Sequence, residues 1–169
     1  PTLSITATPS LLCPGANSSL QAVANSTSYV VSNISYSPVP TPTSGVITLA
    51  AGGVQVTPLN SGTLDDGGWT NLSIPFNFVF FGSTYTNFAV STNGFIALGG
   101  GMPNTFTGYG SAYPNAAKAR PSIGACYSDL NLSNTGTVTV YTVGVTPNRK
   151  VVINWTSAQY YVSSGTITT

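Results

Sequence analysis

Side chains that could perform acid–base chemistry are scarce in this chain of 169 residues. Its acidic residues are Asp65, Asp66 and Asp129, and it contains neither histidine nor glutamate. Without histidine, a serine–histidine–aspartate triad cannot form. Glycoside hydrolysis needs two carboxylates that face each other. Asp65 and Asp66 are adjacent, and adjacent strand residues point to opposite faces. Only Asp129 could therefore form such a pair with one of them. We therefore expect no catalytic residues and a protein that is not an enzyme.

The same acidic residues are the weak candidates for a calcium site. Asp65 and Asp66 follow Asn60 in one predicted loop, and Asp129 precedes Asn131 in another. Calcium binds several carboxylate and carbonyl oxygens together. Asp and Asn in loops more often stabilise turns through bonds to their own backbone, and we favour that interpretation. Zinc would need clustered Cys or His, so we predict no metal site and no cofactor.

The two cysteines, Cys13 and Cys126, are the candidates for a disulfide. An even number of cysteines outside the cytosol favours pairing, and a bridge over so long a loop would stabilise the fold by about 4–5 kcal/mol. Two unpaired or separately buried thiols are the alternative, and both remain open.

A long segment rich in glycine, proline and tyrosine, residues 99–121, holds the candidate ligand contacts. Phe106, Tyr109 and Tyr113 lie there among glycines. Aromatic faces stack on sugar rings and anchor protein interfaces, which suggests a glycan or a protein as ligand. The alternative is a loop that packs its own aromatic side chains onto the fold.

The charge content excludes two classes of partner. Only 4% of the residues are charged, whereas an average soluble domain has about 25%. Nucleic-acid binding needs a dense patch of Lys and Arg, which four cations cannot supply. No apolar run approaches the ~18 residues of a membrane span, so we expect no membrane insertion. A neutral surface of Ser, Thr, Asn and Gly favours a protein of the cell exterior.

Short runs of β-formers predict an all-β fold. Helical periodicity is absent, and 18 glycines and 12 prolines interrupt the chain. Runs of Val, Ile, Thr, Tyr and Phe lie between them, which predicts an antiparallel β-sandwich of Ig-like or nidogen-like type. The predicted strands are 2–8, 18–24, 28–36, weaker ones within 46–58, 74–81, 84–91, 95–98, 122–127, 136–143, 149–155 and 158–163, and residues 60–70 are a predicted loop.

The strongest pattern is a three-stranded meander over residues 74–98. Its first turn is predicted at Gly82-Ser83, and its second at Asn93-Gly94, since both of these residues tolerate a positive φ. Three phenylalanines at alternate positions should share the core-facing side of the first strand: Phe76, Phe78 and Phe80.

Two domains are predicted. Residues 1–24 form a strand region or linker of Ig-like type, and residues 25–169 form the sandwich. The last residues resemble an interrupted strand, so we expect the sandwich to continue beyond the C-terminus.

Two segments carry a resemblance to a known family. The run IPFNFVFFGSTYTNFAVSTNGFIALG (74–99) and the run IGACYSDLNLSNTGTVTVYTVGVTPNRKVVINW (123–155) resemble nidogen-like extracellular domains. They are also similar to modules of giant Bacteroidetes surface proteins, including gliding-motility adhesins exported by type IX secretion. The opening SITATPSLLCPGANSSLQA (4–22) resembles Ig-like repeats of those proteins. The chain departs from the pattern at Tyr127, where the family often has Trp, and at Ser128, where an acidic residue is usual, which weakens any metal role borrowed from the family.

The resemblance implies a non-catalytic module of a large bacterial cell-surface adhesin. Its partners would be an extracellular glycan or protein and the neighbouring modules of the same chain. Two alternatives remain. A structural repeat of an extracellular filament would have an unpaired edge strand that a neighbour completes, and a carbohydrate-binding accessory domain of a secreted enzyme would lose glycan binding without Tyr109 or Tyr113.

Overall fold

The computed structural model describes residues 2–8, 19–25, 38–100 and 121–169. These residues form strands and turns, and every strand pairing among them is antiparallel. The predicted all-β fold is therefore confirmed. No helix that could span a membrane occurs in the described part of the chain.

The chain divides into two compact units, Pro1–Pro38 and Val39–Thr169. In the first, β1 (Thr2–Thr8) pairs with β2 (Ser19–Asn25) in a two-stranded ribbon, close to the strands predicted at 2–8 and 18–24. Residues 26–37 lie outside the described residues, and the predicted domain boundary after residue 24 stays a prediction.

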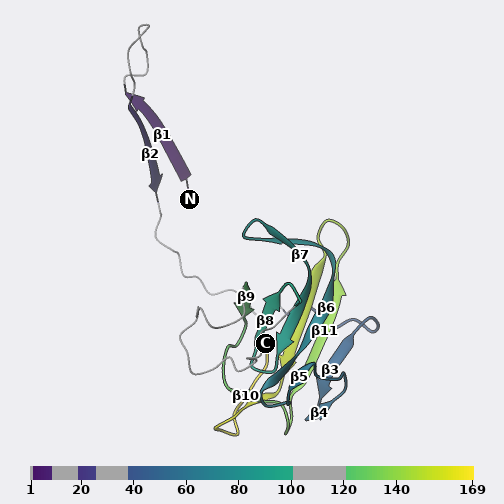
Figure 1. The fold of residues 1–169 in the computed structure, drawn as a ribbon. Coiled ribbons are helices and arrows are strands. Elements are labelled where there is room, and N and C mark those ends of the chain that lie inside the picture. Colours follow the sequence, from purple (N-terminus) through teal and green to yellow (C-terminus); the bar gives the residue numbers. More distant parts are fainter. Residues whose placement is uncertain (1, 9–18, 26–37, 101–120) are drawn as a thin grey trace. The chain divides into compact units, whose positions relative to one another are not determined.

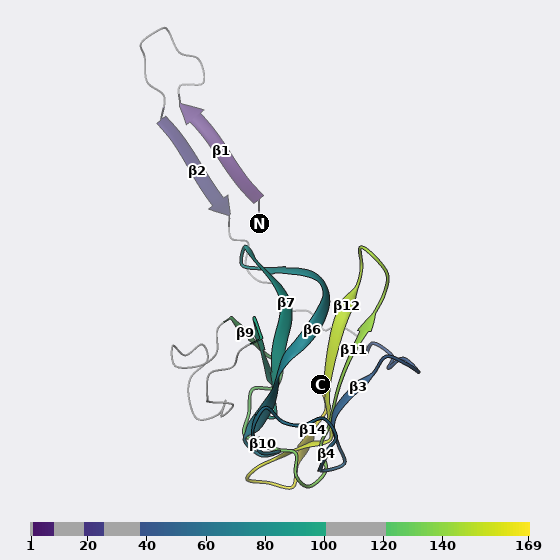
Figure 2. The same ribbon diagram turned by 45° about the vertical axis from the view of Figure 1, so that its right-hand side comes forward.

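The second unit is a sandwich of two principal sheets (Figures 1 and 2). The five-stranded sheet has the order β5 (Ser61–Gly62), β6 (Gly67–Phe80), β7 (Ser83–Ser91), β8 (Phe95–Leu98) and β9 (Ser122–Gly124). The four-stranded sheet has the order β12 (Lys150–Thr156), β11 (Thr137–Val143), β3 (Ile47–Ala51) and β4 (Val54–Gln55). A small third sheet joins β10 (Leu130–Asn131), β13 (Ala158–Tyr160) and β14 (Thr166–Ile167).

Alternating apolar residues of the two principal sheets fill the core between them. Trp69 and Phe88 come from the five-stranded sheet, and Trp155, Val140 and Leu49 from the four-stranded sheet, and all are buried. Successive strand residues point to opposite faces, so this alternation places one apolar face of each sheet in the interior. The indole Nε1 groups of both tryptophans donate to backbone oxygens, that of Trp69 to Thr57 at 2.8 Å and that of Trp155 to Ser91 at 3.1 Å.

Strand β6 begins earlier than its sequence predicts. The segment 67–70 falls in the predicted loop 60–70, but it pairs with both β5 and β7. A register shift between Trp69 and Leu72, with Asn71 at a φ of 56°, marks a bulge that lets the strand continue. Glycine is a poor strand former by itself, and here burial of Trp69 and pairing on two sides outweigh that preference.

The β6–β7 turn lies one residue earlier than predicted. Phe80 pairs with Ser83, so the central residues are Phe81 and Gly82, with φ values of 46° and 78°. Two positive φ values are typical of a type I′ hairpin turn. The alternation of the phenylalanines in β6 is confirmed, because Phe76, Phe78 and Phe80 pack against the core, whereas Phe81 is 92% exposed.

Candidate functional site

Asn93 joins three separate segments of the sandwich. Its side chain is completely buried in the turn between β7 and β8. The amide Nδ2 donates to Asp66 Oδ1 at 2.9 Å, and Oδ1 accepts from the Leu130 backbone N–H at 2.7 Å. The Asn93 carbonyl also accepts from Ser128 N at 3.4 Å. We call this connection of the loop before β6, the β7–β8 turn and the segment before β10 the Asn93 junction.

The loop that enters the junction is held by threonine hydroxyls. Thr63 Oγ1 accepts from the backbone N–H groups of Asp65 and Asp66, both at 3.3 Å. Thr92 Oγ1 donates to the Asp65 carbonyl at 2.7 Å and accepts from Gly67 N at 3.0 Å. These bonds orient the two neighbouring carboxyl groups differently, since Asp66 meets Asn93 whereas Asp65 Oδ1 is buried with no hydrogen-bond partner among the described residues.

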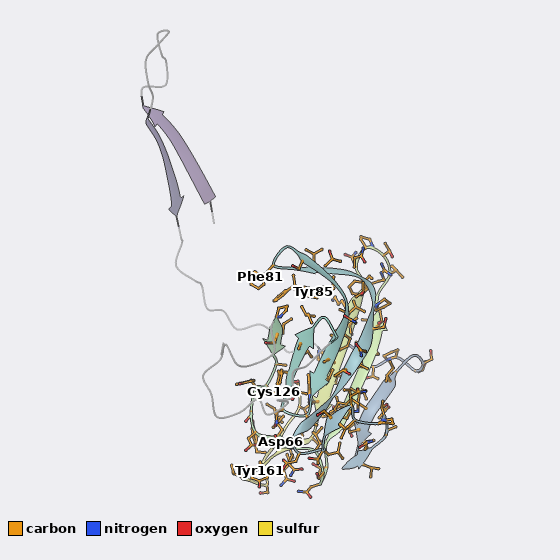
Figure 3. All side chains as sticks on the ribbon, in the orientation of Figure 1. Asp66, Phe81, Tyr85, Cys126 and Tyr161 are labelled. Atoms are coloured by element: carbon orange, nitrogen blue, oxygen red, sulfur yellow. The ribbon has the colours of Figure 1, made fainter. Side chains whose placement is uncertain are left out.

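The fold brings Asp65, Asp66 and Asp129 close enough to interact. Burial raises the pKa of the Asp65 carboxyl, and the charges of Asp66 and Asp129 raise this pKa further. Burial also raises the pKa of Asp129, with a further contribution from Asp66. The three acidic side chains of this weakly charged chain therefore share one region, and Asp66 lies at the end of the sandwich away from Phe81 (Figure 3).

An apolar cleft of about 310 Å³ opens between the two principal sheets. Eleven residues line it: Ile74, Phe76, Phe78, Phe88, Ile96, Leu98, Ile123, Arg149, Lys150, Val151 and Ile153. The Arg149 guanidinium lies 5.1 Å from the centre of the Phe76 ring, and its Nη1 donates to the Pro75 carbonyl at 2.9 Å. The cleft thus combines apolar walls with two cationic residues.

The model of the NIDO-related family matches residues 28–169. This chain belongs to the NIDO-related family. The match includes both segments that resemble nidogen-like domains in sequence, and these segments meet at the Asn93 junction, where Gly94 O accepts from Ala125 N at 3.0 Å and from Cys126 N at 3.1 Å. No curated protein and no solved structure matches the chain.

The structure of the NIDO-related domain describes only some of the predicted site residues. Phe106, Tyr109, Tyr113 and Cys13 lie outside the described residues, so the aromatic ligand contacts and the disulfide stay predictions. Cys126 is a free thiol in the described part of the chain. Burial raises its pKa to about 11, so the thiol stays protonated and weakly nucleophilic at neutral pH.

The prediction of no metal site, with Asp65, Asp66 and Asp129 as weak calcium candidates, also stays a prediction. The three candidate carboxyl groups do share one region, as a site would require. However, no three Asp, Glu, His or Cys side chains within the described ranges are grouped closely enough to hold a metal ion. Asp66 Oδ1 is already engaged by the Asn93 amide, so its observed role is a structural bond.

Two features of the NIDO-related domain were not predicted from the sequence. The predicted turn at Asn93-Gly94 is confirmed, with Gly94 but not Asn93 at a positive φ, whereas the link from Asn93 to Asp66 and Leu130 was not predicted. The cleft beside Arg149 and Lys150 was not predicted either. One pattern in the sequence could have indicated the Asn93 link. Asn93-Gly94 and Asp129-Leu130 each lie in one of the two segments that resemble nidogen-like domains.

Acidification is expected to stabilise the NIDO-related domain. A carboxyl whose pKa is raised by folding binds its proton more tightly in the folded state, so it lowers stability above that pKa. This penalty disappears as the pH falls through the raised pKa of Asp65 and Asp129 towards the unfolded value of about 4. The free energy of unfolding in urea should therefore be higher at pH 4.5 than at pH 6.5.

The variant Asp129→Asn should weaken this pH dependence, because it removes one titrating group and its repulsion of Asp65. The chain has no histidine to titrate over the same interval. A stability that falls steadily between pH 6.5 and 4.5 would contradict the prediction.

Replacing Gly94 with alanine should destabilise the domain by about 2–3 kcal/mol. The φ of Gly94 is 72°, and an added Cβ would collide with Cys126 Sγ. Gly82→Ala is the matched control, because Gly82 has a similar φ of 78° with no atom near an added Cβ. The loss of stability in Gly82→Ala should therefore measure the backbone strain without a collision.

The collision itself is testable by combining Gly94→Ala with Cys126→Ala. Urea unfolding should show that the double variant is more stable than the sum of the single effects by at least about 0.5 kcal/mol. Additive effects would mean that Cys126 does not limit the space beside residue 94.

Proposed function

We propose that this NIDO-related domain is a non-catalytic, extracellular module of a large bacterial cell-surface adhesin, used for display and attachment. The family match over residues 28–169 is the observation that carries the proposal. Nidogen-like segments resemble modules of secreted surface proteins, and the low charge of the chain suits a surface outside the cell.

The chemistry of the described residues supports a role without turnover. Asp66 is bonded to a buried asparagine, and burial raises the pKa of the Cys126 thiol to about 11, so this thiol, when not paired with Cys13, is protonated at neutral pH. General acid–base or nucleophilic catalysis needs groups that exchange protons near the working pH and reach a substrate. Recognition by loops on a rigid sandwich needs neither property.

Antibodies against the domain provide the test. They should label intact cells of the source bacterium and reduce the attachment of these cells to a surface. Labelling that appears only after permeabilisation would contradict the extracellular location. Labelling without an effect of either antibody or Fab fragments on attachment would contradict the adhesive role.

The predicted ligand contacts are tested on the purified chain. Beads coated with the triple variant Phe106→Ala, Tyr109→Ala and Tyr113→Ala should bind extracellular glycans or proteins more weakly than beads coated with the unchanged chain. Tyr161→Ala is the matched control, because Tyr161 is 57% exposed and lies in a different loop. Equal loss of binding in both variants would contradict an aromatic contact in residues 99–121.

A filament repeat is the second candidate function, and one observation supports it. Within the described residues, β12 is an edge strand of the four-stranded sheet, and Thr169 N bonds to its Trp155 carbonyl on the side away from β11. A filament would require neighbouring copies to use this edge, so purified chains should form fibres as their concentration rises. A chain that stays monomeric at millimolar concentration would contradict this function and leave the adhesin proposal standing.

A further inference from the structure

The Asn93-Gly94 pair brings together two groups that can react with each other. The backbone nitrogen of the residue after an asparagine can attack the side-chain amide carbon. Glycine in that position obstructs the attack least, because it has no Cβ and a wide range of backbone angles. Asn93 is the one asparagine of the chain that precedes a glycine. Chemical lability of this kind is a reason why asparagine is depleted in proteins that work at high temperature.

In this reaction, water replaces the side-chain amide. The Gly94 nitrogen loses its proton and forms a bond to Asn93 Cγ, the bond between Cγ and Nδ2 breaks, and Nδ2 leaves as ammonia. One water molecule then opens the five-membered imide, which gives aspartate or isoaspartate at position 93. Water is the only co-reactant, and no group is oxidised or reduced.

Folding restrains the Asn93 side chain against this reaction. Its Nδ2 donates to Asp66 Oδ1 at 2.9 Å, and its Oδ1 accepts from Leu130 N at 2.7 Å. The side chain is completely buried, as are its neighbours Ser91 and Thr92. Ring closure would break both hydrogen bonds in a site closed to water, which is costly for buried polar groups, and the opening of the imide consumes water.

The backbone of the pair is fixed as well. Gly94 O accepts from Ala125 N at 3.0 Å and from Cys126 N at 3.1 Å. Gly94 has a φ of 72°, and a Cβ at this position would collide with Cys126 Sγ, so there is little free space beside the turn. Attack on Asn93 Cγ requires the peptide group between Asn93 and Gly94 to rotate, and these bonds and contacts oppose the rotation.

Neither product suits the Asn93 junction. Aspartate keeps an acceptor for Leu130 N, but it places an oxygen in the position of the Nδ2 donor, opposite Asp66 Oδ1. The Asp66 charge already acts on Asp65 and Asp129, so a fourth carboxyl group adds repulsion. Isoaspartate lengthens the backbone of the turn by one carbon, which disturbs the pairing of β7 with β8.

We propose that Asn93 is a deamidation site that the fold protects and that reacts only in unfolded chains. The folded junction restrains both the amide and Gly94, whereas unfolding releases them and admits water. The modified chain is less stable, so it returns to the folded state incompletely. Unfolding thereby leaves a permanent chemical change at one residue, and the stability of the fold sets the chemical lifetime of the domain. This inference does not depend on the adhesin role.

Mass spectrometry of the whole chain tests the protection. After incubation at pH 8, the chain is digested, and the aspartate and isoaspartate forms of the fragment that contains residue 93 are counted together. Asn93 should react at least about 100-fold more slowly in buffer than in concentrated urea, because few folded chains are open at any time. Similar rates in the two solvents would overturn the proposal.

A short peptide controls for the effect of urea on the chemistry. N-acetyl-Ser-Thr-Asn-Gly-Phe-Ile-amide has the sequence of residues 91–96 without the fold. Its rates in buffer and in urea should agree within about twofold, and the whole chain in urea should react at the rate of the peptide. A much slower reaction of the whole chain in urea would mean that something other than the fold protects Asn93, and the proposal would fail.

Two variants distinguish reaction through unfolding from reaction in the folded chain. Leu49→Ala truncates a completely buried side chain of β3, which lies in the other principal sheet. It increases the unfolded fraction, so it should raise the rate at Asn93 in buffer at least about tenfold. Val162→Ala is the control, since Val162 is 85% exposed, and it should change the rate less than about twofold.

The Leu49→Ala result decides between the two routes. An unchanged rate in this variant would show that Asn93 reacts without unfolding, and would overturn the proposal. Should Leu49→Ala fail to fold, its rate in buffer should equal that of the peptide, and a slower reaction would overturn the proposal equally.

Refolding after modification tests whether the change is permanent. Chains kept in urea at pH 8 should lose the ability to refold on dilution in step with deamidation, as measured by tryptophan fluorescence. Chains kept in urea at pH 5 are the control, because the Gly94 nitrogen keeps its proton there and ring closure is slow, so these chains should refold fully. Full refolding of the deamidated chain with an unchanged urea midpoint would contradict the proposed loss of stability.

Discussion

Replacing Asn93 with alanine is expected to lower the free energy of unfolding by about 3–5 kcal/mol, the largest effect of any polar substitution that we predict. The side chain is completely buried and bonded at both ends, to Asp66 and to Leu130 N. Alanine would leave the Leu130 N–H without its acceptor in a site closed to water. It would also free the Asp66 carboxylate beside two other carboxyl groups.

Urea unfolding measures this effect, and Asn77→Ala is the matched control. Asn77 is an exposed asparagine of β6, so its truncation should change stability by less than about 0.5 kcal/mol. Asn93→Asp refines the test, because it keeps an acceptor for Leu130 N but loses the donor to Asp66. Its cost should be larger at pH 6.5 than at pH 4.5. A loss below about 1 kcal/mol for Asn93→Ala would show that the junction is dispensable.

Trp155→Ala is expected to destabilise the sandwich by about 3–5 kcal/mol, since it removes a large buried side chain and leaves a cavity. Trp155 is 1% exposed and extends from β12 to the other sheet, where its Nε1 reaches the Ser91 carbonyl at 3.1 Å. Trp155→Phe should cost less, about 1–2 kcal/mol, because it keeps most of the apolar volume and loses mainly the hydrogen bond.

The comparison of the two Trp155 variants distinguishes packing from hydrogen bonding. Both are measured by urea unfolding with far-ultraviolet circular dichroism. Val162→Ala serves as the control, because Val162 is 85% exposed and should tolerate truncation. Equal losses for Trp155→Phe and Trp155→Ala would mean that the bond to Ser91, and not the packed indole, holds the two sheets together.

Local patterns were sufficient for the strands that carry them clearly. The alternation of Phe76, Phe78 and Phe80 predicted which side of β6 faces the core, and the structure confirms it. The strand predicted at 95–98 matches β8, and Asn93-Gly94 forms the turn before it. A period of two residues and a turn that requires positive φ are properties of neighbouring residues, so the sequence alone contains them.

Other features depend on segments that meet only in the folded chain. The β6–β7 turn uses Phe81 rather than Ser83 because strand register selects the central pair. Strand β6 starts at Gly67 because β5 and β7 pair with residues that are weak strand formers by themselves. The short strands β5, β10 and β14 have only two residues each, too few for a periodic pattern.

The sequence by itself determined the fold class, the family resemblance and the scarcity of proton-transferring groups, because composition and short-range periodicity suffice for these. Only the tertiary structure decided that Asn93 bonds Asp66 and Leu130, that the three aspartates share one region, and that the β12 edge borders an apolar cleft. Hydrogen bonds, charge–charge interactions and burial depend on distances in space. These distances join residues far apart in the chain, and no local pattern encodes them.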